Sequence, residues 1–265
     1  MIKKALLTGL AALVLSSAAS ISAAPSKEET SKIYKRTSMD YSFLDIYNSQ
    51  IEDALRYFQN NGITNLPPKN LVKAMIFTES GSANGKNCAF AYDPMQIANK
   101  NDPALKALQT KSENTYVLGD FSFLKGKKTT PHKGGRWDYS QSNMDPQSSI
   151  YGGLGWLIHK SSIYGYKVTE PSIKQHTVVK GDTYESISHN EGTSIEILKR
   201  LNPSKIPNQL RIGDKLNYQT AIKCVIGNRS WEKAVALYNG GGDKDYVQKV
   251  YEVKAVLDKR DAVVK

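Results

Sequence analysis

Residues 176–218 carry the pattern of a complete small folding unit, and this unit limits how the rest of the chain can fold. A β-branched run at its start predicts a strand, and Gly181-Asp182-Thr183 predicts a turn and a helix cap. A second helix is predicted to end at Asn202-Pro203, and the run around Leu216 predicts a closing strand. The terminal strands of such a strand–helix–helix–strand unit pair antiparallel, so its two ends lie close together. The unit can therefore be inserted into a surface loop of a larger domain.

Three stretches of this unit occur at the spacing of a known family. They are VVKGDTYESIS near its start, LKRLNP in the middle and LRIGDKLNY at its end. The unit therefore resembles a LysM domain, although Tyr184 and Ser188 replace the leucine and alanine that are usual there. The resemblance implies binding of N-acetylglucosamine-containing glycan, mainly peptidoglycan, between the first helix and the loop before the last strand. A module used only as a spacer is the alternative. The resemblance places Gly181, Asp182, Thr183 and Tyr184 on one side of this groove and the stretch from Pro207 to Ile212 on the other, and within that stretch it implies Leu210 and Ile212 as glycan-binding residues.

Glu79 shares the apolar face of a predicted helix with Val72, Met75 and Ile76. Gly81 is expected to end this helix in the left-handed conformation. Burial and the helix dipole both favour the protonated acid, so the pKa of Glu79 should rise. A carboxyl group that is protonated near neutral pH can donate a proton to a leaving group. The alternative is a frayed helix end at which Glu79 reaches solvent.

Four signals occur in order in the rest of the chain: Glu79-Ser80 at a helix end, DPMQI at 93–97, DPQSSIYGGLGWLIHK at 145–160 and ALYNGGG at 236–242. Their order is the one found in the soluble lytic transglycosylases, which have a lysozyme-like fold. The chain resembles this group over residues 45–165 and 222–257. Because the LysM-like unit falls before the last signal, it is expected to interrupt the catalytic domain. A simple tandem of two domains would leave that last signal unexplained.

The resemblance implies cleavage of the β-1,4 bond between N-acetylmuramic acid and N-acetylglucosamine, which leaves a 1,6-anhydro end. Glu79 would first protonate the bridging oxygen. It would then act as a base and take a proton from the sugar's own 6-hydroxyl group. Five further residues are implied: Ser80 would orient the site, Met95 and Gln96 would line the groove, Tyr238 would hydrogen-bond Glu79, and Asn239 would bond substrate or backbone.

Asp93-Pro94 departs from the Gly-Leu that the family has at this place. If Asp93 faces the cleft, it would supply the second carboxylate that hydrolytic glycosidases use, and the chain would be a muramidase. If it turns outward, it is a loop residue before proline. Asp120 and Asp138 are weaker candidates for the second carboxylate. A non-catalytic wall-binding protein is a further alternative, against which the carboxylate of Glu79 on an apolar face argues.

The sequence thus predicts a mainly α (α+β) fold, in which a lysozyme-like catalytic domain is interrupted by a small βααβ LysM module. Glu170-Pro171-Ser172 and Gln219-Thr220 are the expected junctions. The predicted bounds are 1–23 for a signal peptide, 24–40 for a flexible segment, 41–173 and 219–258 for the two parts of the catalytic domain, 174–218 for the module and 259–265 for a tail.

The first 23 residues have the pattern of a secretory signal, because two lysines precede an apolar run and small residues follow it. The run is too short to span a bilayer. We expect a periplasmic or secreted protein that is associated with the cell wall and not stably inserted in a membrane. The formal charge of +11 falls by two when Lys3 and Lys4 are removed. An exported basic protein is expected to meet the cell wall rather than nucleic acid, and charge that serves solubility alone is the alternative.

Cys88 and Cys224 are the two cysteines of the chain. In the oxidising compartment that export implies, such a pair is expected to form a disulfide. The bond would tie the early chain to the late chain, and two buried free thiols are the alternative. The four histidines lack zinc-like spacing, so we expect no metal ion and no cofactor.

The region from Thr110 to Met144 mixes aromatic residues with lysines, and its Lys-Gly turns suggest a hairpin or a long loop. We expect this region to wall the groove, with aromatic faces on sugars and cations on muramyl lactate or stem-peptide carboxylates. A surface hairpin with solvated charges is the alternative. The residues concerned are Tyr116, Phe121, Phe123, Trp137, Tyr139, Lys125, Lys127, Lys128, Lys133 and Arg136.

Overall fold

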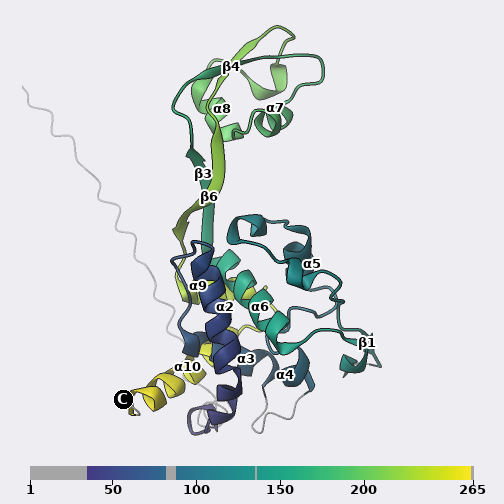
Figure 1. Cartoon of the computed structure of the whole chain (residues 1–265), viewed down its shortest axis with the longest axis vertical. Coiled ribbons are helices and arrows are strands. Elements are labelled where there is room, and N and C mark those ends of the chain that lie inside the picture. The colour runs from purple at the N-terminus through teal and green to yellow at the C-terminus, as the bar shows by residue number, and fades with distance from the viewer. Residues whose placement is uncertain (1–34, 82–87, 135, 264–265) are drawn as a thin grey trace, which may run out of the picture.

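The computed structural model describes residues 35–81, 88–134 and 136–263. In this part of the chain a helical domain stands at one end and a small module at the other, and an antiparallel ribbon joins them (Figure 1). The ribbon consists of β3 (Ser162–Val168) and β6 (Ala221–Asn228), and its register shifts once, between Ile163 and Tyr164. The ribbon was not predicted from the sequence. The sequence did predict a mainly helical chain with a small mixed module, and the structure confirms it.

The helical domain draws its core from both sides of the inserted module. Buried residues from Tyr41 to Ile158 and from Ala234 to Leu257 form one hydrophobic cluster. Its short elements are the 3-10 helices η1 (Ser42–Tyr47), η2 (Thr115–Leu118), η3 (Ser122–Leu124) and η4 (Tyr139–Gln141) and the hairpin of β1 (His132–Lys133) and β2 (Arg136–Trp137). Its α-helices are α2 (Asn48–Asn60), α3 (Lys69–Ser80), α4 (Cys88–Tyr92), α5 (Pro103–Thr110), α6 (Pro146–Ser161), α9 (Trp231–Tyr238) and α10 (Tyr246–Val263).

Helix α6 runs through the centre of this domain and is buried along most of its length. Asp145 caps its N-terminus by accepting a hydrogen bond from the Ser148 N–H. Gly153 lets the loop that contains Met95 pack directly against the helix, since an added Cβ would lie 2.4 Å from the Met95 Cβ. A larger residue at this position would push the loop away.

Helix α3 packs along α10, which brings Glu79 close to the late part of the chain. Val72, Met75 and Ile76 are buried, as the shared face predicts. The expectation that Gly81 takes a left-handed conformation is wrong, because its φ is −71°. Glycine is needed there for space instead: an added Cβ would lie 2.7 Å from the Phe77 Cα.

The small module has the predicted order of strand, helix, helix and strand. Thr183 and Ser194 cap its two helices, each by accepting a hydrogen bond from a backbone N–H three residues later. A separate buried cluster, which includes Ile187 and Leu198, forms its core. The first strand lies slightly before the predicted β-branched run. The elements are β4 (Lys174–Thr177), α7 (Tyr184–Asn190), α8 (Ile195–Leu201), the 3-10 helix η5 (Pro207–Gln209) and β5 (Lys215–Tyr218), with β4 and β5 antiparallel.

The described residues begin at 35 near the N-terminus and end at 263 near the C-terminus. The signal peptide predicted at 1–23 lies outside the described residues. In the segment predicted to be flexible, the part from residue 35 onward is held to the domain, because Arg36 Nε lies 2.7 Å from Glu252 Oε2 on α10. Helix α10 itself continues to Val263. In the part of the chain that the structure describes, no helix is long and apolar enough to cross a membrane.

The predicted disulfide is absent, and Cys88 and Cys224 are both free thiols. Helix α4, which begins with Cys88, lies on the side of the helical domain away from the ribbon (Figure 1). Cys224 lies in β6 of that ribbon, opposite Gly165. A disulfide needs Cα atoms within about 7 Å, and these two elements do not meet.

Candidate functional site

Glu79 lies in the last turn of α3 and keeps part of its surface exposed. Surrounding protein raises the pKa of its carboxyl group to about 7, and this burial is the largest effect. The Tyr246 hydroxyl donates a hydrogen bond of 2.5 Å to Glu79 Oε1 and acts in the opposite direction. The negative charges of Asp102, Asp93 and Asp243 raise the pKa further. Glu79 therefore exchanges a proton readily near neutral pH, as a general acid or base must.

Ser80 connects the end of α3 to the loop at residues 93–98. Its buried hydroxyl lies 2.8 Å from the carbonyl oxygen of Pro94 and 3.1 Å from that of Ile76. This hydroxyl fixes the loop relative to the turn that carries Glu79. The expected orienting role of Ser80 is thus compatible with its contacts.

Asp93 lies inside the protein, with an exposed fraction of 0%. Its carboxylate accepts hydrogen bonds from Ser149 Oγ at 2.6 Å, from the Ala98 N–H at 2.9 Å and from the Ile97 N–H at 3.2 Å. Burial raises its pKa, while these three donors act to lower it. Asp93 thus neither faces a cleft nor turns outward, the two positions considered from the sequence. It holds the loop against α6.

The side chains of Met95 and Gln96 do not point to solvent. Met95 is fully buried beneath Gly153, so the expectation that it lines a groove is wrong. Gln96 is also buried, and its amide nitrogen donates to the Tyr139 hydroxyl at 2.9 Å and to the Asp93 carbonyl at 2.8 Å. The φ of Gln96 is +53°, a strained value that residues other than glycine rarely adopt. The hydrogen bonds of its side chain hold this conformation.

The resemblance implied a hydrogen bond between Tyr238 and Glu79, but the structure has a different one. The Tyr238 hydroxyl donates instead to the Met95 carbonyl oxygen at 2.7 Å. Asn239 bonds backbone, because its amide nitrogen donates to the Asp243 carbonyl at 2.7 Å and its oxygen accepts from the Asp243 N–H. These bonds close the glycine loop and return the chain so that Tyr246 reaches Glu79. Sequence reasoning missed Tyr246, although its helical spacing from Val250 marks it as core-facing.

The aromatic residues of Thr110–Met144 do not form one exposed wall. Phe121 and Tyr139 are buried, whereas Tyr116 and Trp137 are exposed. The expected wall of aromatic faces is therefore wrong, because Phe121 and Leu124 fill the core beside α6. Asp120 and Asp138 have local roles, since each accepts a hydrogen bond from the backbone N–H two residues later.

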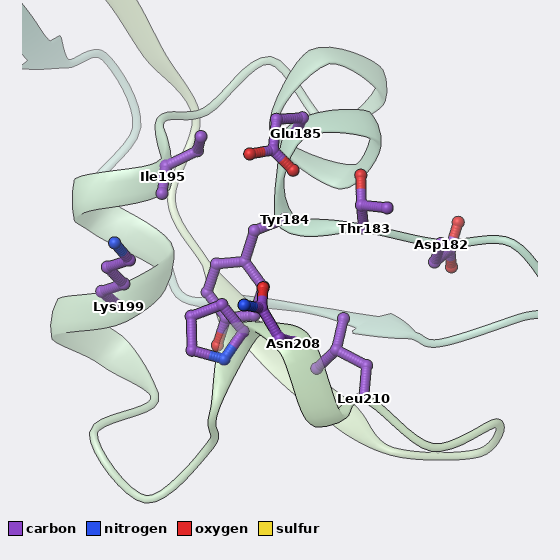
Figure 2. A pocket seen from close by; sticks show the side chains of 9 residues that line it. Asp182, Thr183, Tyr184, Glu185, Ile195, Lys199, Asn208 and Leu210 are labelled. Atoms are coloured by element: carbon purple, nitrogen blue, oxygen red, sulfur yellow. The ribbon is translucent and has the colours of Figure 1, made fainter.

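The small module has a pocket of about 310 Å³ between its two helices and the η5 loop. Figure 2 shows Thr183 just before α7, Glu185 on α7, Lys199 on α8, and Asn208 and Leu210 on the loop, all lining this pocket. Four of the six residues that the resemblance implied line it: Asp182, Thr183, Tyr184 and Leu210.

Two implied residues do not line this pocket, and three of its residues were missed. Gly181 is outside it, and Ile212 is 72% exposed beyond its edge. Glu185, Ile195 and Lys199 line it but were not predicted. The spacing of Ile195 and Lys199, four residues apart on one helix, is the signal that places both on the same face.

Comparison with known families identifies this module. Residues 176–217 match the family model described as the LysM domain. The module is a LysM domain. Domains of this family bind peptidoglycan or chitin glycans and are typical of extracellular and cell-wall proteins. No curated protein and no solved structure matches the chain.

His176 links the start of the LysM domain to its pocket. Its imidazole lies 2.8 Å from both Asp182 Oδ2 and Glu191 Oε1. Burial alone would lower the pKa of His176, but the two carboxylates outweigh it and the pKa is raised. The pKa of Asp182 is lowered by the Val179 N–H and then by His176. This ion pair fixes one edge of the pocket.

The described residues contain no group of three or more His, Cys, Asp or Glu side chains that could hold a metal ion.

Proposed function

We propose that this protein is an exported lytic transglycosylase that cleaves peptidoglycan and holds the polymer through its LysM domain. The observation that carries the proposal is Glu79, a partly exposed residue at the end of α3 whose carboxyl group has a pKa of about 7 and accepts a hydrogen bond from Tyr246. The LysM domain supports the choice of substrate, because its family binds N-acetylglucosamine-containing glycans. A signal peptide at 1–23 would deliver the protein to the cell wall.

The reaction needs a proton donor and then a proton acceptor at the same place. Protonated Glu79 gives its proton to the bridging oxygen as the bond to C1 of N-acetylmuramic acid breaks. The resulting carboxylate takes the proton of the C6 hydroxyl group, whose oxygen bonds to C1. Glu79 is restored, no water is consumed, and the product carries a 1,6-anhydro ring. A group with a pKa near 7 suits both steps, because neither form is strongly favoured.

The neighbouring carboxylates favour this mechanism over hydrolysis, in which a second carboxylate activates water or attacks the sugar. Three carboxylates act on the pKa of Glu79, and each is already engaged. Asp93 is buried with three donors. Asp243 pairs with Lys249 at 2.6 Å, and Asp102 caps α5 by accepting from the Ala104 N–H at 2.7 Å. A mechanism that uses Glu79 alone fits this arrangement best.

The remaining contacts have supporting roles in this proposal. Tyr246 holds the rotamer of Glu79, and Ser80 and Tyr238 fix the loop at 93–98 through its carbonyl oxygens. In the LysM domain, the pocket bounded by α7, α8 and η5 would hold the glycan away from the cut bond. Binding at two places raises the time that the enzyme spends on one polymer.

Digestion of purified sacculi, followed by mass spectrometry of the muropeptides, tests the proposal. Products lighter by one water than hydrolytic ones support it. Glu79→Gln should slow their release by about 10²–10⁴-fold, the usual contribution of a general acid. Glu232→Gln, a change of an exposed glutamate on α9, is the matched control and should act like the native protein.

Two other outcomes would overturn the proposal. Reducing ends would mean hydrolysis, and Asp102→Asn would then be the next variant, because Asp102 is partly exposed whereas Asp93 is buried. No products, with the native protein and Glu79→Gln both sedimenting with the wall, would mean a wall-binding protein. Glycan binding is tested separately by cosedimentation with peptidoglycan and chitin: Asn208→Ala and Leu210→Ala should weaken it several-fold, and the exposed Ile206→Ala should not.

A further inference from the structure

The helical domain has a pocket at the C-terminal end of α5. Its volume is about 670 Å³, and α5, η3 and the turn after η3 surround it. We call it the α5 pocket. Leu108 and Phe121 give it an apolar floor, while the residues around its rim are polar. It shares no lining residue with the Glu79 site or with the LysM pocket.

The rim of the α5 pocket is basic. Four lysines and one aspartate line it. Lys111 faces the aspartate, Asp120, at 3.7 Å, and Lys127 pairs with Asp145 at 2.5 Å. Within the described residues Lys125 and Lys128 are exposed and have no ion-pair partner. Two positive charges at the mouth of an apolar pocket are thus free to meet an anion.

The loop that carries these lysines is held in place from two sides. The amide nitrogen of Gln109 donates to the carbonyl oxygens of Leu124 and Lys127 at 2.8 and 2.9 Å. On the other side, Asn143 donates to the Gly126 carbonyl and accepts from the Lys128 N–H, both at 2.8 Å. The pocket is therefore formed before any ligand arrives, which lowers the entropy that binding costs.

The α5 pocket and the Glu79 site lie at opposite ends of one short helix. Asp102, whose charge acts on Glu79, caps the start of α5, and the pocket lies at the end of this helix. An eight-residue helix is about 12 Å long. A side branch of a glycan held at Glu79 would have to span about this length to meet the pocket.

We propose that the α5 pocket binds the stem peptides of the substrate. This inference rests on the proposed function, because it assumes that the polymer is peptidoglycan. Stem peptides combine free carboxylates with small alkyl side chains such as that of alanine. The carboxylates match Lys125 and Lys128, and the alkyl groups match the floor of Leu108 and Phe121. Neutral sugar lacks the charge, and inorganic phosphate lacks the apolar part.

A synthetic stem pentapeptide ending in D-alanyl-D-alanine is the probe, and titration into the isotope-labelled protein observed by NMR is the measurement. The expected result is a saturable shift of backbone amides in residues 105–128. Lys125→Gln with Lys128→Gln should weaken binding about tenfold, as the loss of two partly exposed ion pairs implies. Lys233→Gln with Lys259→Gln removes two exposed charges elsewhere on the same domain and should leave binding unchanged.

Three results would overturn the inference: no shift at the highest soluble concentration, shifts outside this region, or equal binding by the Lys125/Lys128 double variant. Competition by inorganic phosphate at the same concentration would also overturn it, because the pocket would then be a general anion site. The titration involves no catalysis, so it can fail while the digestion of sacculi succeeds, and the reverse. In turnover assays, the double variant should raise KM on peptide-bearing glycan and leave KM on peptide-free glycan unchanged.

Discussion

The Glu79 site and the LysM pocket are assembled in different ways. The LysM pocket takes its residues from one stretch, residues 182–210, in which each contributor is close to the next along the chain. The Glu79 site joins α3 to the loop at 93–98 and to Tyr246, which follows the whole inserted domain. The first can be inferred from neighbouring sequence signals. The second depends on helix packing that brings distant residues together.

The two sites also differ in how polar groups are satisfied. Around Glu79, buried hydroxyl, carboxyl and carbonyl groups bond one another, so each change leaves a partner unpaired in the core. In the LysM domain the charged groups of His176, Asp182 and Glu191 lie near the surface, where water replaces lost contacts at small cost. Substitutions around Glu79 are therefore expected to destabilise the fold, whereas substitutions of the charged residues of the LysM domain are expected to be tolerated.

Excision of the LysM domain should have the largest effect, and it tests whether the helical domain folds and acts without that domain. Thr169 and Thr220 face each other at the end of the ribbon, where the Thr169 N–H donates to the Thr220 carbonyl at 2.9 Å. Replacing residues 170–219 with Asn-Gly, a favoured two-residue hairpin turn, should leave the helical domain folded. We expect release of products from sacculi to fall about 100-fold, because the second attachment is lost, and from short soluble glycan to stay unchanged. A helical domain that unfolds after this excision would contradict the separation.

Asp93→Asn tests whether Asp93 contributes to the stability of the Glu79 site or to the reaction itself. The Asp93 carboxylate accepts three hydrogen bonds. The NH₂ group of an asparagine would face one or more of these donors and could not accept from them, which should lower the free energy of unfolding by about 2–3 kcal/mol. Urea unfolding measures this cost, and the products of the folded fraction should keep their 1,6-anhydro ends. Unchanged stability together with lost activity would give Asp93 a direct part in the reaction.

Tyr246→Phe removes the hydrogen bond that lowers the pKa of Glu79. Without it the pKa should rise above about 7, and the alkaline limb of the pH–rate profile should move to higher pH because Glu79 stays protonated longer. Turnover should fall about tenfold, since the rotamer of Glu79 is no longer held. Tyr238→Phe is the matched control: its hydroxyl bonds Met95, so the limb should keep its position.

His176→Asn should have the smallest effect, and one that depends on pH. The folded-state pKa of His176 is raised above 6.5, so its stabilising contribution is fully present below 6.5 and is lost as pH rises through the raised value. The variant should therefore lose a few degrees of LysM melting temperature at about pH 6 and almost nothing at about pH 9. Thermal unfolding followed through the NMR signals of α7 and α8 at both pH values measures this, and an equal loss at both would contradict the ion pair.

Local signals predicted the LysM domain well and the Glu79 site in part. The caps Thr183 and Ser194 and the stop at Asn202-Pro203 are fixed by nearby residues, and the structure contains them. Glu79 was predicted because its helical face is a local property. Its partner was not. Tyr238 ends α9 and Tyr246 begins α10, on either side of the same glycine loop, and only the packing of α10 on α3 selects Tyr246.

Burial was the other property that sequence reasoning misjudged. Asp93 precedes a proline, which is typical of an exposed loop, yet Ser149 on α6 and two backbone N–H groups satisfy its carboxylate in the core. The ribbon was missed as well, although SIYGYKV and AIKCVIGN are both rich in β-branched and aromatic residues. Each strand had a visible signal, but their pairing joins residues that are more than fifty positions apart.

The division of the helical core by the inserted domain has a consequence for the order in which the chain can fold as it emerges from its N-terminus. The LysM domain has its own buried cluster and can fold once residue 218 has emerged. The helical domain lacks α9 and α10 at that moment, so α3 has no helix to pack against on that side. Glu79 meets Tyr246 only when the final helix docks. The glycan-binding part of the protein is thus complete before its reactive carboxyl group is put in place.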